Sequence, residues 1–170
     1  MNDNPIPAID AGIDPLKIEY RPIDSLKPAK RNARTHSKKQ IEQIVSAMRR
    51  FGFTNPLLVD ADGVVVAGHG RLAAARKLGM TEVPAIQLAH LTKAELQAYA
   101  LADNKLAELA GWDEEMLRLD FEELQTLELD FDLEITGFST TQIDLLLDGK
   151  TSRKKVNEEA IPEVSSEPVW

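Results

Sequence analysis

The chain of 170 residues contains no cysteine, which excludes structural disulfides and thiolate metal sites and fits a reducing compartment. It also lacks any apolar run that approaches the length of a membrane span. Its first fifteen residues contain acids and prolines instead of the apolar core of a signal peptide. We therefore expect a soluble, cytoplasmic protein with no membrane contact.

Charge is unevenly distributed along the chain, whose net charge is −8. Residues 27–50 contain eight basic side chains and a single acid, Glu42, whereas residues 103–148 contain fourteen acids against Lys105 and Arg118. An acidic total argues against sequence-independent DNA binding as the main function, because such binding needs many cations to displace the counterions of the phosphates. A local basic patch could still contact DNA. The acidic region fits a solvated surface or a surface that docks a partner, and with weaker support a mimic of DNA.

Hydrophobic periodicity predicts an α+β fold: a small mixed β-sheet with a βαβ-like unit, followed by a helical C-terminal subdomain. Strands are expected at residues 17–23, 55–60, 64–67 and 83–88. Asp62-Gly63 suits a tight hairpin turn, since glycine tolerates positive φ. The strand, helix and strand of Val64–Leu88 form the βαβ-like unit, with a right-handed crossover if the two strands are parallel.

Helix starts are marked by four N-cap residues, Ser37, Thr92, Asp113 and Ser139. A glutamine or glutamate three residues later predicts capping boxes at Ser37 and Thr92. A further helix is expected from about Arg71 to Leu78, and the helix after Thr92 is expected to break near Asp103-Asn104.

These signals divide the chain into four parts. We expect a flexible leader at 1–15, a folded domain at 16–112, an acidic helical extension at 113–148 and a linker or disordered tail at 149–170.

A strand ends on Gly68-His69-Gly70-Arg71, where a helix begins. Free N–H groups and the helix dipole favour an anion at such a point. The glycines permit a close approach of the backbone, and the guanidinium of Arg71 matches the oxygens of a phosphate. The alternative is a tight turn in which Arg71 pairs with an acid, because the pattern is neither a P-loop nor a complete G-x-G-x-x-G.

Other polar residues are candidates for the same site. His69 could donate to a phosphate or act as a catalytic acid or base, although a surface donor is the commoner role of a lone histidine. His36 could join it. Asp103-Asn104-Lys105 is either an exposed helical turn or a second phosphate-contacting element, with Asp103 as a Mg²⁺ ligand.

Taken together, several motifs in order resemble the N-terminal domain of the ParB/sulfiredoxin superfamily. The resemblance covers about residues 17–112 and rests on Asp-Ser-Leu-Lys-Pro at 24–28, Asn-Ala-Arg at 32–34, Gly-Phe-Thr-Asn-Pro-Leu-Leu-Val at 52–59, Val-Ala-Gly-His-Gly-Arg-Leu-Ala-Ala-Ala at 66–75 and Leu-Ala-Asp-Asn-Lys at 101–105. The glycine turn reads Gly-Glu-Arg-Arg in ParB proteins and Gly-Cys-His-Arg in sulfiredoxins. The two middle positions differ here, which puts ParB-like hydrolysis in doubt and excludes sulfinic-acid reduction.

This resemblance implies a nucleoside triphosphate site, for CTP or ATP with Mg²⁺. The implied nucleotide-binding residues are Gly68, His69, Gly70, Arg71, Asn32, Arg34, Asn104 and Lys105. The details are closest to a phage and prophage subgroup in which the domain often precedes a DNA methyltransferase. No S-adenosylmethionine motif or Asp-Pro-Pro-Tyr tetrapeptide occurs in these residues, so this segment alone is not expected to methylate.

Three functions therefore stay open. The first is a nucleotide-binding module, with possible NTPase activity, that serves DNA modification or processing, as part of a methyltransferase fusion or alone. The second is a DNA-binding specificity module or ParB-like nuclease without nucleotide switching, contacting DNA through Lys30, Arg31, Lys38 and Lys39. The third is a pure interaction module. A nucleotide-dependent homodimer is a further expectation from the resemblance.

Overall fold

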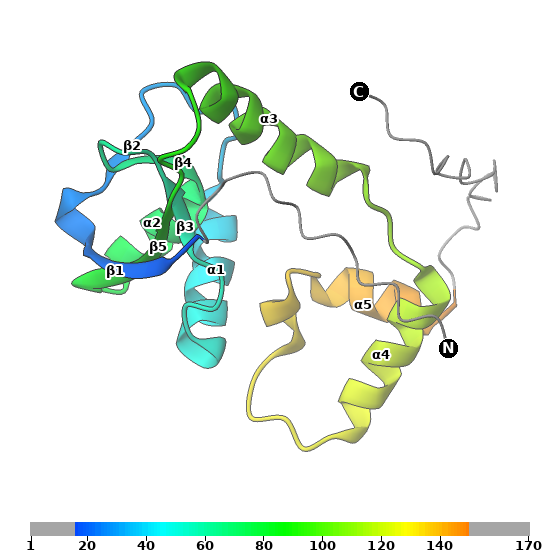
Figure 1. The fold of residues 1–170 in the computed structure, drawn as a ribbon. Coiled ribbons are helices and arrows are strands. Elements are labelled where there is room, and N and C mark those ends of the chain that lie inside the picture. The colour runs from blue at the N-terminus through cyan, green and yellow to red at the C-terminus, as the bar shows by residue number, and fades with distance from the viewer. Residues whose placement is uncertain (1–15, 150–170) are drawn as a thin grey trace, which may run out of the picture.

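A computed structural model describes residues 16–149, which form a mixed sheet with helices packed around it (Figure 1). The sheet has five strands in the order β1-β5-β3-β4-β2. The strands are β1 (Ile18–Pro22), β2 (Lys27–Pro28), β3 (Leu57–Val59), β4 (Val64–Ala67) and β5 (Glu82–Gln87). The leader at 1–15 and the tail from residue 150 on lie outside the described residues.

Five α-helices and two short 3₁₀ turns complete the described part of the chain. They are α1 (Lys38–Phe51), α2 (His69–Lys77), α3 (Lys93–Leu109), α4 (Glu114–Thr126) and α5 (Thr140–Leu147), with η1 (Ile23–Ser25) and η2 (Leu133–Thr136). The predicted fold class, a small mixed sheet followed by a helical C-terminal part, is confirmed.

The direction of β4 differs from that of a simple parallel βαβ unit. Strand β3 pairs antiparallel with β4 and parallel with β5, so β4 and β5 run in opposite directions with β3 between them. The cause is the predicted hairpin turn: Asp60 Oδ1 accepts from the N–H groups of Asp62 (2.9 Å) and Val64 (2.8 Å), which reverses the chain at Gly63. Because the condition of parallel β4 and β5 is not met, the right-handed crossover rule does not apply to this unit.

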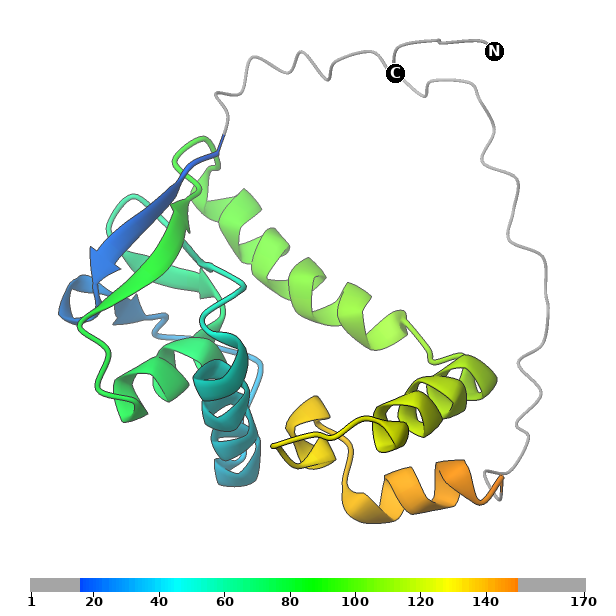
Figure 2. The same ribbon diagram turned by 90° about the horizontal axis from the view of Figure 1, so that it is seen from below.

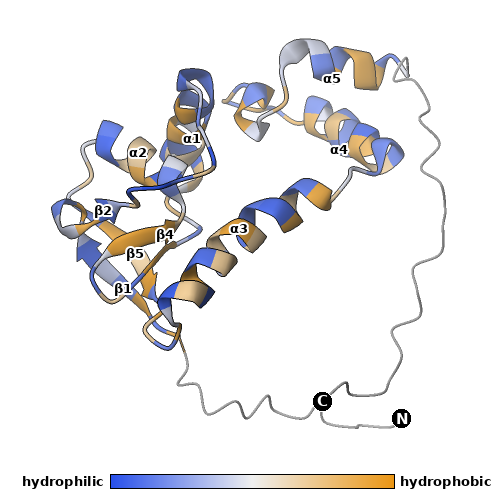
Figure 3. Cartoon of the chain, turned by 90° about the horizontal axis from the view of Figure 1, so that it is seen from above, coloured by the Kyte–Doolittle hydropathy of each residue, from blue (hydrophilic) through white to orange (hydrophobic). Residues whose placement is uncertain are grey.

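Two separate hydrophobic cores hold the structure together. The first lies between the sheet and α2, and its fully buried members include Leu57, Val65 and Leu72. The second joins α4 to α5 around Phe121 and Ile143. Between the two cores runs α3, which buries none of its residues completely and extends away from the sheet towards α4 (Figure 2). Hydropathy colouring shows the same contrast, with apolar central strands and a helix α3 of mixed colour (Figure 3).

Helix caps follow the sequence signals closely. The reciprocal bonds between Thr92 and Glu95 are both present, as expected. Ser37 accepts from Gln40 N (3.1 Å), but the Gln40 side chain bonds His36 Nδ1 (3.0 Å) instead of returning to the cap, so only half of that capping box forms. The expected break near Asp103 is wrong: Asn104 Nδ2 donates to Ala100 O (2.7 Å), and α3 continues through this point.

Helix α2 begins at His69, two residues before the predicted start, because Gly68 adopts a left-handed conformation (φ 98°) as its N-cap.

Within residues 16–149, no helix combines the length and the apolar character that crossing a membrane requires.

Candidate functional site

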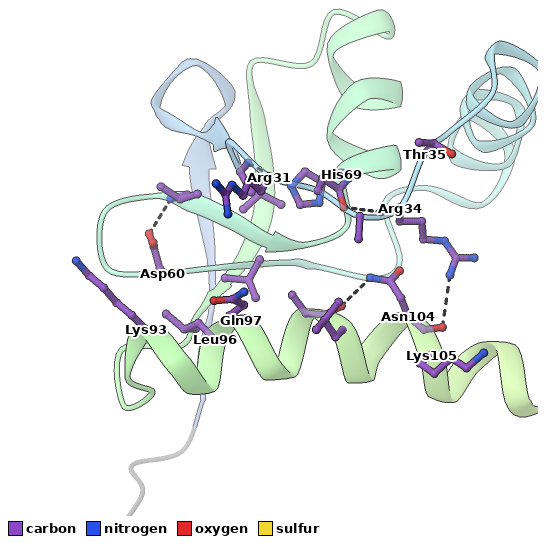
Figure 4. A pocket seen from close by; sticks show the side chains of 18 of the residues that line it. Arg31, Arg34, Thr35, Asp60, His69, Lys93, Leu96, Gln97, Asn104 and Lys105 are labelled. Carbon is purple, nitrogen blue, oxygen red and sulfur yellow. Dashed lines mark hydrogen bonds between the residues drawn. The ribbon is translucent and has the colours of Figure 1, made fainter.

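A cavity of about 1010 Å³ opens between β4, the loop before α1 and one face of α3 (Figure 4). It gathers residues from three parts of the chain that the sequence analysis had singled out separately. The predicted residues that line it are Arg31, Asn32, Arg34, His69, Asn104 and Lys105. The cavity is large enough for a small organic ligand of the size of a nucleotide.

One end of the cavity is built from a basic pair and an acid. Arg34 Nη1 lies 3.3 Å from Glu108 Oε1 and donates to Asn104 O at 3.5 Å. Lys105 Nζ lies 3.5 Å from the other oxygen of Glu108. Asn32 Oδ1 accepts from the backbone N–H of Arg34 (3.1 Å), which fixes the local course of the loop. The two cations thus share one carboxylate, and an anionic ligand could take its place.

Several polar residues of the cavity were missed by the sequence analysis. From the hairpin come Asp60 and Asp62, and from α3 come Lys93, Gln97 and Glu108. The residues of α3 recur at intervals of three or four positions, so they share a helix face with Asn104. That spacing was the available signal for these three, whereas nothing local indicated that the hairpin would face α3.

His69 is held by the loop on the other side of the cavity. Its Nε2 accepts a hydrogen bond from Ala29 N (3.3 Å), which assigns the proton of the neutral ring to Nδ1. Burial lowers the pKa of His69 below its ordinary value, and the nearby His36 lowers it further. This ring therefore supports the loop as a neutral acceptor, and its suggested catalytic role stays a prediction.

Arg71 does not line the large cavity. It lines a second cavity of about 160 Å³ with Phe53, Thr54 and Asn55, beside the C-terminal half of α1. Its Nε is buried and has no hydrogen-bond partner among the described residues. Burial lowers the pKa of Arg71, an effect that the charge of Asp103 opposes. A buried donor without a partner is costly in a folded protein, so this atom is a candidate ligand contact.

The two glycines of the turn have different surroundings. A Cβ on Gly68 would lie 2.7 Å from Leu57 Cδ2 and 2.8 Å from Arg71 Nη2, so the guanidinium folds back over Gly68. A Cβ on Gly70 would lie 3.1 Å from both His36 Cε1 and Ile44 Cδ1. In this structure Gly70 therefore allows close packing between α2 and α1, and its predicted contact with a ligand stays a prediction.

The remaining candidates lie outside both cavities. Lys30, Lys38, Lys39 and Asp103 are exposed, and none of them lines either cavity. The structure thus brings the predicted loop, turn and α3 residues to one region. Of the four proposed DNA contacts, Arg31 lines the large cavity, and Lys30, Lys38 and Lys39 lie on the surface outside both cavities.

Comparison with protein families gives two matches along the chain. The ParB N-terminal domain matches residues 13–105, more than half of the chain, and the ParB-methyltransferase HTH domain matches residues 115–170. The second match covers α4 and α5, which the sequence analysis had described only as an acidic helical extension.

Individual relatives agree with these matches. A ParB-like nuclease domain-containing protein, YnaK of Escherichia coli K12, is 50% identical over 82 residues, which is 48% of this chain and 94% of the relative. The nucleoid occlusion protein of Geobacillus kaustophilus is 30% identical over 117 residues, covering 65% of this chain and 41% of that protein.

Among solved structures, the C-terminally truncated chromosome-partitioning protein ParB of Caulobacter crescentus, complexed with CTP-gamma-S, shares the fold. The TM-score is 0.63 at 19% identity, over 81% of this chain and 88% of that one. The order of motifs, the mixed sheet and these matches lead to one conclusion: the chain belongs to the ParB N-terminal domain family.

Proposed function

We propose that this chain is a nucleoside triphosphate-binding module that serves a DNA-modifying or DNA-processing system. The observation on which the proposal rests is the cavity of about 1010 Å³, which combines cationic and amide side chains at one end with the first turn of α2. The ParB structure that shares the fold was solved with a nucleotide analogue, which supports the same choice of ligand.

The phosphates are proposed to lie at the N-terminus of α2. The first helical hydrogen bond of α2 runs from Leu72 N to Gly68 O (2.9 Å), so the N–H groups of His69, Gly70 and Arg71 have no acceptor within the helix. His69 lines the large cavity and Arg71 the small one, so this turn lies where the two cavities meet the helix. Backbone amides, the helix dipole and the unpaired Arg71 Nε then act together on an anion.

Magnesium fits this proposal only if it binds together with the phosphates of the nucleotide. Within residues 16–149, no three histidine or acidic side chains lie close enough together to hold a metal ion. Mg²⁺ commonly binds through one or two carboxylates together with the phosphates of a substrate, and Asp103 is the proposed carboxylate. Hydrolysis is not part of the proposal, because His69 is engaged with Ala29.

Calorimetric titration of the full chain with CTP, ATP, GTP and ADP, each with Mg²⁺, tests the proposal. Arg71→Ala should weaken triphosphate binding about ten- to a hundredfold, because a charge-assisted bond contributes about 1.5–3 kcal/mol. Lys77→Ala is the matched control, since Lys77 is an exposed cation of the same helix that pairs with Glu42 and lines neither cavity. Equal affinity of the Arg71→Ala variant and the control would remove Arg71 from the site, and no binding of any nucleotide would overturn the proposal.

Direct DNA contact is a second candidate function. The exposed cations Lys30, Lys38 and Lys39 and the match to the ParB-methyltransferase HTH domain favour it. A DNA contact through these cations predicts an affinity that falls steeply with salt, with a smaller slope after Lys38→Ala and Lys39→Ala together. An unchanged slope would exclude these two lysines. The HTH match also supports a partnership with a DNA methyltransferase. Co-purification of a DNA methyltransferase with the tagged chain from its native cells would support this partnership, and its absence would argue against it.

A further inference from the structure

The part of the chain around the sheet core and the part around the α4–α5 core meet in a contact that combines an ion pair with aromatic rings. Residues 130–137, named here the latch segment, lie between the end of α4 and the start of α5 and pack against α1 through η2. In Figure 2 this segment lies beside α1, far from the point where α3 leaves the sheet. None of its residues belongs to the sheet core, so its contact with α1 joins the part of the chain built on the sheet core to the part built on the α4–α5 core.

The contact is centred on Arg50. Its two terminal nitrogens reach both oxygens of Asp130, at 2.8 Å and 2.5 Å. The same guanidinium lies 4.9 Å from the ring centroid of Phe131, and Phe51 meets that ring edge-on at 6.0 Å. At the other end of the segment, Gln43 Nε2 donates to Gly137 O at 3.5 Å. The latch segment therefore spans α1 from Gln43 to Phe51.

The latch segment is joined firmly to α5 and α4. Glu134 Oε1 accepts from both the N–H and the hydroxyl of Thr140 at 2.9 Å, which ties η2 to the first turn of α5. Phe138, which follows the segment, packs edge-on against Trp112 and Phe121. Any movement of the segment away from α1 would thus carry α4 and α5 with it.

The charged part of the contact is exposed. The Arg50 and Asp130 side chains are 42% and 73% exposed. The hydrogen bonds from Thr140 lower the pKa of Glu134, and the charge of Lys39 on α1 lowers it slightly further. Exposed ion pairs are weak and are screened by salt, whereas the two cores are apolar and insensitive to it. Between α3 and Trp112 the chain runs through Ala110 and Gly111, and a Cβ on Gly111 would meet no atom within 4 Å.

We propose that the latch segment is a reversible electrostatic latch, which holds the helical part α4–α5 against α1 and shields Arg50 from polyanions. With the latch closed, Asp130 and Phe131 occupy the guanidinium of Arg50, which a nucleic acid backbone would otherwise contact. With the latch open, α4 and α5 turn about Ala110 and Gly111 together with Trp112, whose ring packs on Phe138, and the basic face of α1 is accessible. This device depends on neither the nucleotide site nor the identity of the nucleotide.

Distance measurements on the full chain test the latch. Because the chain has no cysteine, Ser46→Cys on α1 and Thr141→Cys on α5 can be spin-labelled selectively, and both positions are exposed. We expect one narrow distance distribution at low salt. Asp130→Arg should shift the ratio of closed to open forms about three- to thirtyfold towards open, as expected for the loss of an exposed ion pair and a cation–π contact. The double variant Arg50→Glu with Asp130→Arg should recover most of the closed form.

Two controls separate the latch from general charge effects. Lys77→Glu reverses a charge that pairs with α1 from α2, and it should leave the distance unchanged. Glu123→Arg makes the same change of charge as Asp130→Arg, but on the exposed surface of α4. Fluorescence anisotropy measures the affinity of each variant for double-stranded DNA. A threefold or greater gain in affinity for Asp130→Arg over Glu123→Arg supports shielding, and equal gains overturn it. A distribution for Asp130→Arg as narrow as that of the unmodified sequence overturns the latch itself.

Discussion

The substitution Gly68→Ala addresses the turn on which the proposed site is built. Gly68 has φ 98°, and an added Cβ would lie 2.7 Å from Leu57 Cδ2 and 2.8 Å from Arg71 Nη2. The left-handed conformation costs an L-residue about 1–2 kcal/mol. Overpacking against a core leucine and the guanidinium adds about 1–3 kcal/mol. Together these effects should lower the free energy of unfolding by about 2–5 kcal/mol.

Gly79→Ala separates the two contributions. Gly79 also has a positive φ (70°), but a Cβ there would meet no atom within 4 Å. This control should cost only the backbone term of about 1–2 kcal/mol. The smaller entropy of the unfolded chain favours both variants equally and cancels in the comparison. Urea unfolding followed by circular dichroism measures both, and a Gly68→Ala variant as stable as Gly79→Ala would refute the packed turn described here.

Three further predictions concern single side chains. Burial lowers the pKa of His69 below its ordinary 6.5, so the unfolded chain takes up a proton at a higher pH than the folded chain does. The free energy of unfolding should therefore decline as the pH falls from about 6.5 through the lowered pKa. His69→Asn should make the urea midpoints between pH 5 and 8 less dependent on pH. An unfolding profile as steep in the variant would contradict this assignment. Glu108→Gln removes the carboxylate that pairs with Arg34 and Lys105. Because exposed ion pairs contribute about 0.2–1 kcal/mol, triphosphate binding measured by calorimetry should tighten up to about fivefold. Unchanged or weaker binding would argue against phosphates beside Arg34 and Lys105. Thr92→Ala removes the hydroxyl that accepts from Glu95 N, while the N–H of residue 92 can still donate to the Glu95 side chain. The loss of this cap should destabilise α3 by about 1 kcal/mol, seen as faster amide exchange in its first turns, and unaltered exchange would show that the cap does not limit this helix.

The candidate site was predicted in part. The loop residues Asn32 and Arg34 and the helix residue Asn104 were chosen from motifs more than sixty positions apart, and the cavity brings them together. The orientation of Arg71 was not predictable in this way. It depends on the tertiary packing of α2 against α1, which places Arg71 in the smaller cavity beside Ile44, Ala47 and Met48.

The sequence by itself determined the features that a few neighbouring residues can settle. The cap at Thr92 and the turn at Asp60–Gly63 are made by hydrogen bonds within four positions, so their geometry follows from local residue types. Only the tertiary structure decided that β5 pairs with β3, that the hairpin faces α3 and that Arg50 meets Asp130, because these contacts join segments about thirty to eighty positions apart. Such pairings depend on the packing of the whole chain, where the burial of apolar faces outweighs the preference of any single residue.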